Sequence, residues 1–324
     1  MTKKVVWLMV SCLVAAALLL ASCGPATEKE VTPAPEEEAG TTPPVSPDRW
    51  AQQDPLPQRR DLNGVWASSS SDFFAVGDVG TILHYDGSTW SSMSSGTMAN
   101  LNGVWGTSSS DVFAVGRSGT IVHYDGSAWS SMDSGTTEDF RDVWGSSSSD
   151  FFAVGGAGTI VHYDGSTWSS MDSGTTGILI GVWGSSSSDV SAVGWRGTIV
   201  HYDGSTWSSM SSGTTANLLD VWGTSSSDVF AMGRSGTIVH YDGSTWSSMD
   251  SGTTQFLTGV WGTSSSDVFA VGRGGTSLHY DGSTWSSMGS GTTQFLNGVW
   301  GTSSSDVFAV GTGGTILYYL EYIE

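Results

Sequence analysis

The sequence predicts an all-β fold: a seven-bladed β-propeller of four-stranded antiparallel blades, with the ring closed by an N-terminal strand. Three observations predict it. Trp residues recur every 39 residues from Trp66 to Trp300, and a second series recurs at the same interval from Trp90 to Trp285. Each 39-residue unit holds four short runs rich in Val, Phe, Ile, Tyr and Trp, separated by Gly, Ser and Asp. Four strands in about 40 residues are typical of one propeller blade.

The unit that begins at Leu101 shows why each run is expected to be a strand. Leu-Asn-Gly-Val-Trp-Gly comes first, and a Ser run ending in Asp111 separates it from Val-Phe-Ala-Val. This second run is apolar at successive positions, so we expect its strand to be covered on both faces, as in sheets packed around an axis. Gly-Thr-Ile-Val-His-Tyr supplies the third strand and Trp-Ser-Ser-Met the fourth, with turn residues between them. Outside residues 1–22, no stretch has helical periodicity.

The segment around Trp50 is predicted to close the ring. The first three runs of the unit occur seven times, but the Trp-containing fourth run occurs six times, because the last copy ends after its third run. Trp50 lies 16 residues before Trp66, and Trp90 lies 15 before Trp105. The segment can therefore supply the missing outer strand to the seventh blade, which leaves no sheet edge unpaired at the seam. The alternative is that Trp50 belongs to a linker.

The N-terminus is predicted to direct the chain to the bacterial cell envelope. Lys3 and Lys4 precede an apolar run of signal-peptide length, which ends in Leu-Ala-Ser-Cys-Gly. This ending resembles the bacterial lipoprotein signal, which implies cleavage after residue 22 and lipidation of Cys23. Residues 23–48 are rich in Pro and Glu and predict a disordered tether, and residues 49–324 form the propeller. The protein would then be lipid-anchored and extracytoplasmic. The alternatives are an uncleaved membrane anchor or an ordinary signal peptide.

The composition excludes several classes of protein. The 324 residues include 31 Asp+Glu and 11 Lys+Arg, for a formal net charge of −20. We expect no nucleic-acid partner, because neutralising phosphates requires a basic stripe. Only 13% of residues are charged, too few for a coiled coil, and an aromatic content of 11% is too high for a disordered chain. We expect a monomer without a cofactor.

The repeat resembles known propeller families. Its Asp-Gly-Ser-Thr-Trp tail, which runs from Asp86 to Trp90 in the first copy, resembles the Asp-box repeat of bacterial neuraminidases, Ser-x-Asp-x-Gly-x-Thr-Trp, but is one residue shorter. From Leu62 onward the unit is similar to repeats of bacterial surface proteins described as glycosyl-hydrolase-like or photosystem II assembly-factor-like. Gly-Val-Trp-Gly also resembles tectonin-type lectin propellers. These resemblances imply a propeller fold; for function they imply a sialidase-like hydrolase or an assembly factor.

The repeated His and Asp residues are expected to be structural. His84 and its five equivalents recur once per blade on the third strand, where neighbouring copies diverge and cannot share a metal ion. Asp72 and its equivalents close the Ser runs and most simply satisfy turn groups, although a ring of them could attract a cation. A sialidase needs an Arg cluster and a Tyr with a Glu partner, and the repeats hold one Glu, Glu138. We therefore predict no catalytic residues and no metal site.

The positions at which the copies differ predict a binding face. Variation concentrates at the tip between the second and third strands and at the connection between blades. In an antiparallel blade these two loops emerge at the same end, so the variable residues share one face, and the invariant turns share the other. Binding usually resides in variable loops on a rigid scaffold. The predicted site comprises Arg117, Arg141, Trp195, Arg196, Arg234, Phe256, Arg273 and Phe295.

We expect this face to bind a glycan, an envelope component or a protein, which would make the chain a non-catalytic binding or scaffold module. Trp and Arg are the residues most often found at the energetic centre of interfaces. The alternative for the variation is neutral drift among duplicated copies. The alternatives for the function are a sialidase-like glycoside hydrolase and an assembly factor for an envelope complex.

Overall fold

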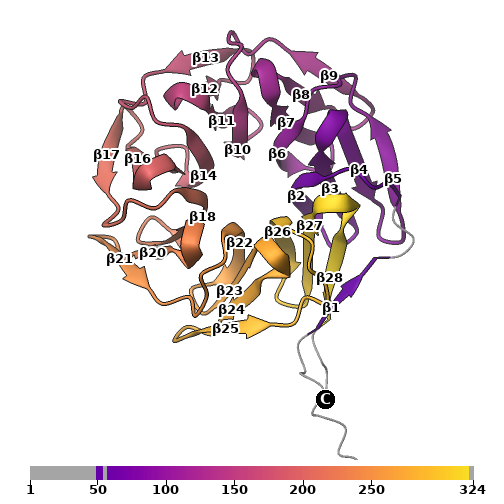
Figure 1. Ribbon diagram of the computed structural model, residues 1–324. Helices are drawn as coiled ribbons and strands as arrows, with labels where there is room; N and C mark the ends of the chain where they lie inside the picture. Colours follow the sequence, from indigo (N-terminus) through magenta and orange to yellow (C-terminus); the bar gives the residue numbers. More distant parts are fainter. Residues whose placement is uncertain (1–48, 54–56, 321–324) are drawn as a thin grey trace, which may run out of the picture. The chain divides into compact units, whose positions relative to one another are not determined.

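The structure, a computed structural model, describes residues 49–53 and 57–320. These residues form seven four-stranded antiparallel sheets arranged as blades around a central channel (Figure 1), as the sequence predicts. The predicted signal peptide, the lipidated Cys23 and the tether of residues 23–48 lie outside the described residues. Among the residues that are described, no helix is long and apolar enough to cross a bilayer.

Each blade presents its first strand to the channel and its second strand behind it. Blades 1 to 7 are numbered in the order of their innermost strands. The innermost strands are β2 (Leu62–Ser69), β6 (Leu101–Ser108), β10 (Phe140–Ser147), β14 (Leu179–Ser186), β18 (Leu218–Ser225), β22 (Leu257–Ser264) and β26 (Leu296–Ser303). The second strands are β3 (Asp72–Gly77), β7 (Asp111–Gly116), β11 (Asp150–Gly155), β15 (Asp189–Gly194), β19 (Asp228–Gly233), β23 (Asp267–Gly272) and β27 (Asp306–Gly311).

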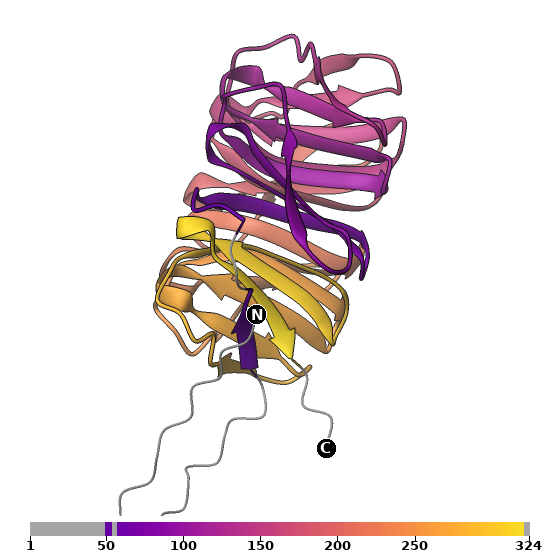
Figure 2. The same cartoon turned by 90° about the vertical axis from the view of Figure 1, so that its right-hand side faces the viewer.

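Two further strands complete each blade toward the outer wall. The third strands are β4 (Thr81–Tyr85), β8 (Ile121–Tyr124), β12 (Ile160–Tyr163), β16 (Thr198–Tyr202), β20 (Ile238–Tyr241), β24 (Ser277–Tyr280) and β28 (Ile316–Leu320). The outermost strands are β5 (Trp90–Ser94), β9 (Trp129–Met132), β13 (Trp168–Met171), β17 (Trp207–Ser211), β21 (Trp246–Met249), β25 (Trp285–Met288) and, for blade 7, β1 (Arg49–Gln52). Figure 2 shows the blades from the side.

The core lies between neighbouring sheets. All four apolar residues of the second strand in blade 2, Val112 to Val115, are at most 1% exposed, so both faces of this strand are covered. Close approach of the blades depends on the glycine that follows the inner Trp. A Cβ on Gly106 would lie 2.8 Å from Cη2 of Trp66, which packs from the preceding blade. A side chain at this position would therefore push the two blades apart.

Two Trp residues depart from the predicted ring of buried inner Trp. In blade 1, Trp66 stacks on Phe74 of its own blade at 6.3 Å, and three other blades repeat this stack. In blades 2 and 7 the corresponding Phe instead contacts a Phe of the following blade, with ring centroids 4.3 Å and 4.5 Å apart. Those extra rings are Phe151 and Phe73, which stand where all five other copies have Val.

Because Phe151 and Phe73 fill the space beside blades 2 and 7, Trp105 and Trp300 turn into the central channel. There the two indoles meet edge to face, with centroids 4.9 Å apart. Both rings are partly exposed, whereas the other inner Trp rings are at most 9% exposed. In the sequence, Asp-Phe-Phe at residues 72–74 and 150–152 marks this change, and the Trp that turns belongs to the preceding blade.

The N-terminal strand closes the ring as predicted. Strand β1 pairs antiparallel with β28, and Trp50 lies opposite Tyr319. Trp50 is 6% exposed, and its Nε1 donates a 2.8 Å hydrogen bond to Oγ of Ser277 in blade 6. Ser277 stands where the other copies have Ile, and the outermost Trp residues of the other blades have no partner for Nε1. The outermost Trp at the seam therefore makes a hydrogen bond that the outermost Trp residues of the other blades lack.

We expect Trp50→Ala to lower the free energy of unfolding by about 3–5 kcal/mol, because it removes a large buried ring and its hydrogen bond to Ser277. Urea unfolding measures this change. The matched control is Trp195→Ala, a Trp that is 44% exposed, which should change the free energy by no more than about 0.5 kcal/mol. Equal effects of the two substitutions would contradict closure through Trp50.

Candidate functional site

The structure brings the tips and the inter-blade connections together on one face, as predicted. Each tip is a three-residue turn rather than the expected two-residue tip, and its second residue has positive φ, such as Val79 at 56°. The N–H of that residue points to the connection that follows the blade. In four blades it donates to an Asn or Asp side chain: Val79 to Asn100, Ser118 to Asp139, Arg196 to Asn217 and Gly313 to Asp61, at 2.8–3.0 Å.

Three connections replace this capping side chain with an apolar one. Ile178, Phe256 and Phe295 stand at the position that is Asn or Asp in the other four copies. Their side chains carry no acceptor, so the N–H groups of Ala157, Ser235 and Gly274 lose the cap that the other tips have. Phe295 is 42% exposed and Phe256 is half-buried. These connections give up a hydrogen bond and expose apolar surface, so the stability of the fold does not explain them.

Four of the predicted residues form one continuous row across blades 5 to 7, which we call the Arg–Phe row: Arg234, Phe256, Arg273 and Phe295. The guanidinium carbon of Arg234 lies 5.2 Å from the ring centroid of Phe256. Arg273 lies between the two rings, 4.5 Å from Phe256 and 5.2 Å from Phe295. Cation and ring alternate along the row, within the range at which cation–π attraction acts.

The other four predicted residues lie outside this row. Trp195, which is 44% exposed, and Arg196 occupy the tip of blade 4, next to the tip of Arg234. Arg117 is exposed on the tip of blade 2, three blades from the tip that carries Arg234. Arg141 lines the central channel, and its Nη2 lies 3.5 Å from Oδ2 of Asp139. The prediction of a shared face therefore holds for the tips, whereas Arg141 belongs to the channel.

Three residues of this face were not predicted from the sequence. Arg59 and Arg60 are exposed in the connection that enters blade 1, where a Cβ on Gly314 would lie 3.0 Å from Cα of Arg59. Met98, 75% exposed, occupies the equivalent place before blade 2. Arg60 aligns with a variable position of the connections, whereas Arg59 and Met98 align with a position that is Thr in the other five copies. The two Arg residues were missed because the segment before Leu62 resembles the repeat too weakly to be aligned, and Met98 because its position is otherwise constant.

The side chains of the outer wall and the opposite face are engaged within their own blades. Nε2 of His84 lies 2.6 Å from Oδ1 of Asp72, and the other His residues pair in the same way, which confirms their structural role. His279 lowers the pKa of Asp267, whereas burial raises the pKa of Asp306, whose blade has Tyr318 in place of His. The Asp carboxylates thus bind His and a Ser or Thr hydroxyl rather than turn backbone, and the described residues hold no cluster of three metal ligands.

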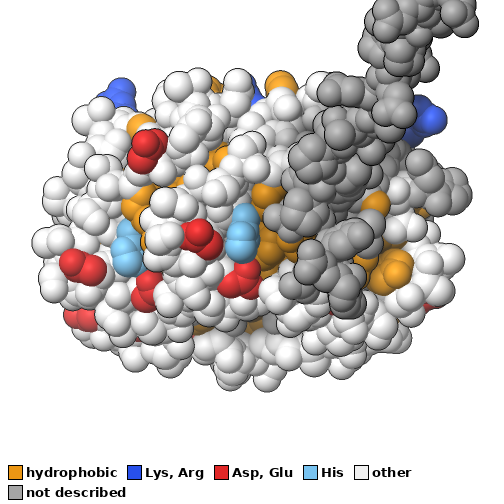
Figure 3. All heavy atoms as spheres, turned by 90° about the horizontal axis from the view of Figure 1, so that it is seen from below, with side chains coloured by type: hydrophobic (Ala, Val, Ile, Leu, Met, Phe, Trp, Pro, Cys, Tyr) orange, Lys and Arg blue, Asp and Glu red, His pale blue; other side chains and the backbone are white. Residues whose placement is uncertain are grey.

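The Asp-Gly-Ser turns of the opposite face are closed by their own carboxylates. Oδ1 of Asp86 accepts hydrogen bonds from the Ser88 hydroxyl and from the backbone N–H groups of Ser88 and Thr89, at 2.7–2.9 Å. The Ser88 hydroxyl, followed by these N–H groups, lowers the pKa of Asp86 to about 2. Figure 3 shows the ring edge-on, with Arg side chains on one rim and acidic and His side chains on the wall.

The central channel opens among the innermost strands and encloses a cavity of about 380 Å³. One ring of its lining residues joins neighbouring blades by hydrogen bonds to the first carbonyl of the next inner strand. These donors are Asn63 to Leu101, Asn102 to Phe140, Thr258 to Leu296 and Asn297 to Leu62, at 2.5–2.9 Å. Arg141, Ile180 and Leu219 occupy the other three places in the ring.

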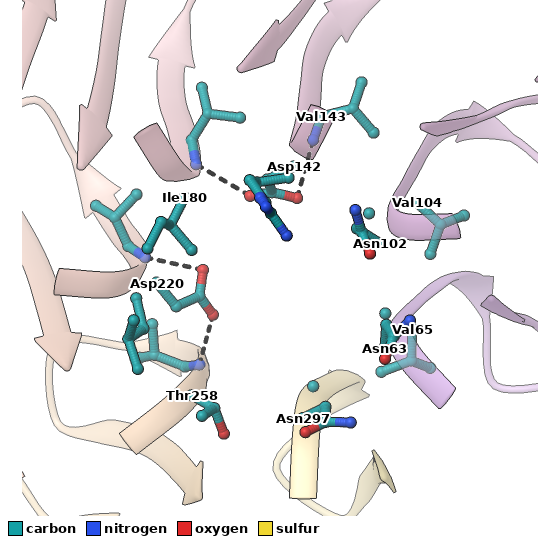
Figure 4. Close-up of a pocket in the computed structure, with 18 of the residues that line it drawn as sticks. Asn63, Val65, Asn102, Val104, Asp142, Val143, Ile180, Asp220, Thr258 and Asn297 are labelled. Atoms are coloured by element: carbon teal, nitrogen blue, oxygen red, sulfur yellow. Dashed lines mark hydrogen bonds between the residues drawn. The ribbon is translucent and has the colours of Figure 1, made fainter. Parts of the chain in front are cut away.

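Two partly buried carboxylates replace the missing contacts at two boundaries. Asp142 and Asp220 stand where the other five copies have Gly, directly after Arg141 and Leu219. Asp142 accepts the N–H of Val143 at 2.9 Å and that of Val182 in blade 4 at 3.0 Å (Figure 4). Asp220 does the same with Val221 and Val260, at 2.9 and 2.8 Å. This pair was not predicted from the sequence, although the change from Gly to Asp is visible there.

Burial shifts the protonation of this pair. It raises the pKa of Asp142 to about 7, against the hydrogen bonds from Val182 and Val143 that lower it. Burial and the charge of Asp142 raise the pKa of Asp220 well above its ordinary value. Each carboxylate already binds two backbone N–H groups of the channel wall, so its first role is to join blades.

Solved structures share this architecture. A structure described as YCF48 bound to D1 peptide is 19% identical, with a TM-score of 0.71 over 84% of this chain and 94% of that one. YCF48 from Cyanidioschyzon merolae is 18% identical, with a TM-score of 0.69 over 84% of this chain and 98% of that one. The WD40 β-propeller domain of Doa1 is 13% identical, with a TM-score of 0.71 over 83% and 95%. At these identities the similarity shows the fold alone.

The sequence matches no protein-family model and no curated protein. The resemblances drawn from the repeat are thus confirmed for the propeller fold. The Asp-box, lipoprotein and tectonin features stay predictions.

The channel pair predicts a pH dependence of stability. Because the folded-state pKa values lie above the ordinary value of 3.8, the contribution of the pair to stability is complete at low pH and is lost as the pH rises through about 7. The free energy of unfolding should therefore fall by on the order of 2 kcal/mol between pH 5 and pH 8 because of this pair.

Urea unfolding of the native chain and of the variant Asp142→Gly/Asp220→Gly measures this dependence. Glycine is the residue of the other five blades, so the variant differs from the native chain only at the two carboxylates. The variant should lose most of the difference between pH 5 and pH 8. The same difference in both proteins would contradict the assignment to Asp142 and Asp220.

Proposed function

We propose that the chain is a non-catalytic binding propeller that holds a segment of a partner protein on its variable face. One observation carries this proposal: the three large apolar side chains that the structure exposes most, Met98, Trp195 and Phe295, all lie on that face. The Arg residues of the repeat tips lie there too. Because the most exposed large apolar side chains are confined to one face and lie among polar groups there, that face is favoured as the interaction site.

A protein segment is favoured over a glycan as the ligand. The face offers loops and rows of exposed side chains, and the one described cavity on it is an open hollow lined by Gly197 and residues 210–215. The other two described cavities lie in the channel and between blades 7 and 1. Flat surfaces suit an extended chain, and Arg with aromatic residues forms the energetic centre of many protein interfaces. The structure of YCF48 with D1 peptide supports this choice, since a propeller of the same architecture has been solved with a peptide bound.

We further propose that the protein acts at the cell envelope, anchored through a lipid on Cys23. The proposal rests on the N-terminal sequence, in which Lys3, Lys4 and an apolar run precede Cys23. Metabolic labelling with a fatty-acid analogue tests it. Labelling of the native chain, and its loss in Cys23→Ala, is expected; equal labelling of both would contradict it.

A peptide library and a glycan array, each applied to the purified full chain, test the class of ligand. We expect retention of peptides and little retention of glycans. Trp195→Ala/Arg196→Ala or Arg234→Ala/Arg273→Ala should reduce retention about tenfold, because these changes remove the exposed anchors. Ser109→Ala, at an exposed turn of the opposite face, is the control and should leave retention unchanged.

Retention that survives both double substitutions would contradict the assignment of the face. Retention on the glycan array alone would replace the protein ligand with a carbohydrate. Turnover of a fluorogenic sialoside by the native chain would restore the hydrolase alternative, and a single partner purified in stoichiometric amounts would favour an assembly factor.

A further inference from the structure

The Arg–Phe row presents aromatic and cationic side chains where other copies have a side chain that caps the tip by a hydrogen bond. At the position of Phe256 and Phe295, four copies carry an Asn or Asp that caps the preceding tip. The two Phe residues give up that hydrogen bond, and one of them remains 42% exposed. Each Phe instead lies beneath an Arg of a neighbouring tip. The substitution therefore exchanges a structural contact for an ordered cationic and aromatic surface.

The two guanidinium groups of the row are free to bind an anion. Among the described residues, Arg141 is held in an ion pair by Asp139, whereas neither Arg234 nor Arg273 is in an ion pair. Both Arg residues are exposed, their guanidinium carbons lie 5.2 and 4.5 Å from the centroid of the Phe256 ring, and neither guanidinium donates a hydrogen bond to another described residue. A planar guanidinium with open N–H edges matches a carboxylate with two parallel hydrogen bonds.

The balance of charge differs between the two sides of the face. Blades 4 to 6 carry Arg196, Arg234 and Arg273 on successive tips. Around blades 1 to 3 the tips and connections carry six acidic residues against Arg59, Arg60 and Arg117: Asp61, Asp78, Asp133, Glu138, Asp139 and Asp172. Beside the three Arg residues of blades 4 to 6, the tips and connections carry one acidic residue, Asp250. The side that holds the Arg–Phe row is therefore net positive and the other side net negative, so an acidic ligand is attracted to the row.

We propose that the Arg–Phe row docks an extended acidic segment of a partner protein, with carboxylates at alternate positions on Arg234 and Arg273 and an apolar side chain on Phe295. This inference rests on the proposed function and names the chemistry of its ligand. The two guanidinium carbons lie at most ~10 Å apart, since both are close to Phe256, and alternate side chains of an extended strand are about 7 Å apart. Two acidic side chains of one strand can thus reach both Arg residues.

A neutral glycan fits the row less well. Phe offers no hydrogen-bonding group, so sugar hydroxyls placed over Phe256 and Phe295 would lose water without gaining a partner. The guanidinium groups bind an anion more strongly than a neutral hydroxyl. An apolar side chain of a peptide, by contrast, gains from contact with an exposed ring.

The test uses the full chain in detergent and a fluorescently labelled peptide with Glu at positions i and i+2 and Leu at i+4. Fluorescence anisotropy should show binding that weakens as salt is raised from 0.05 to 0.3 M, because the contacts are ionic; these concentrations are about the range over which the Debye length falls below 10 Å. The same peptide with Gln in place of Glu should bind about tenfold more weakly. Equal affinity of the two peptides would overturn the proposal.

The variant that tests the row is Phe256→Asn/Phe295→Asn, which installs the residue that the chain itself has at Asn100 and Asn217. Restored caps on Ser235 and Gly274 should leave the unfolding midpoint unchanged or raised, while the peptide binds about tenfold more weakly. Ile178→Asn makes the same change outside the row and should leave the affinity unchanged. Equal affinity of the double variant and the native chain would overturn the proposal.

Two outcomes separate this inference from the proposed function. If Trp195→Ala/Arg196→Ala releases library peptides while the double Phe variant does not, the face binds protein and the row is the wrong part of it. If an anionic oligosaccharide binds through the row and the Glu peptide does not, the ligand is a carbohydrate and the peptide assignment fails.

Discussion

Coverage of each sheet on both faces is the constraint on which the rest of the structure depends. Val112 to Val115 are buried on either side of their strand, so blade 2 is stable only between two neighbouring blades. A row of such sheets ends in two uncovered faces unless it closes on itself. Closure requires the first strand of the chain to join the last sheet, and the contact of Trp50 with Ser277 fixes that seam. The ring then holds the tips of all seven blades in one plane, as a rigid support for variable side chains.

On this support, the positions at which one copy differs from the others show which residues have a role of their own. Arg141 and Leu219 do not make the hydrogen bond to the next blade that Asn or Thr makes at this position in four other copies. The residue that follows each of them is Asp instead of Gly, and its carboxylate joins the two blades. These departures serve the ring. Phe256 and Phe295 are of another kind, because they remove a cap worth about 1 kcal/mol and expose aromatic surface. Comparing the contacts of equivalent positions thus separates substitutions that maintain the fold from those that serve binding.

The sequence predicts the blade count, the closing strand and the pairing of each His within its blade, because these features follow from the period and from contacts inside one unit. Features that depend on two units were harder to predict. Trp105 turns into the channel because of Phe151 in the next blade, and Arg273 meets Phe256 and Phe295 across two boundaries. The variable face was predicted from loop geometry, whereas the row within it required knowing which tips and connections touch.

The central claim is that the tips without a cap at the Arg–Phe row bind the ligand. Amide exchange at the second residue of each tip tests it most directly, because the same N–H groups report both the cap and the bound ligand. In the free chain, the capped N–H groups of Val79, Ser118 and Arg196 should exchange slowly, and the uncapped ones of Ala157, Ser235 and Gly274 quickly. Adding the acidic peptide should slow Ser235 and Gly274 alone. Slowing at Ala157 as well, or at the turns of the opposite face, would contradict the account.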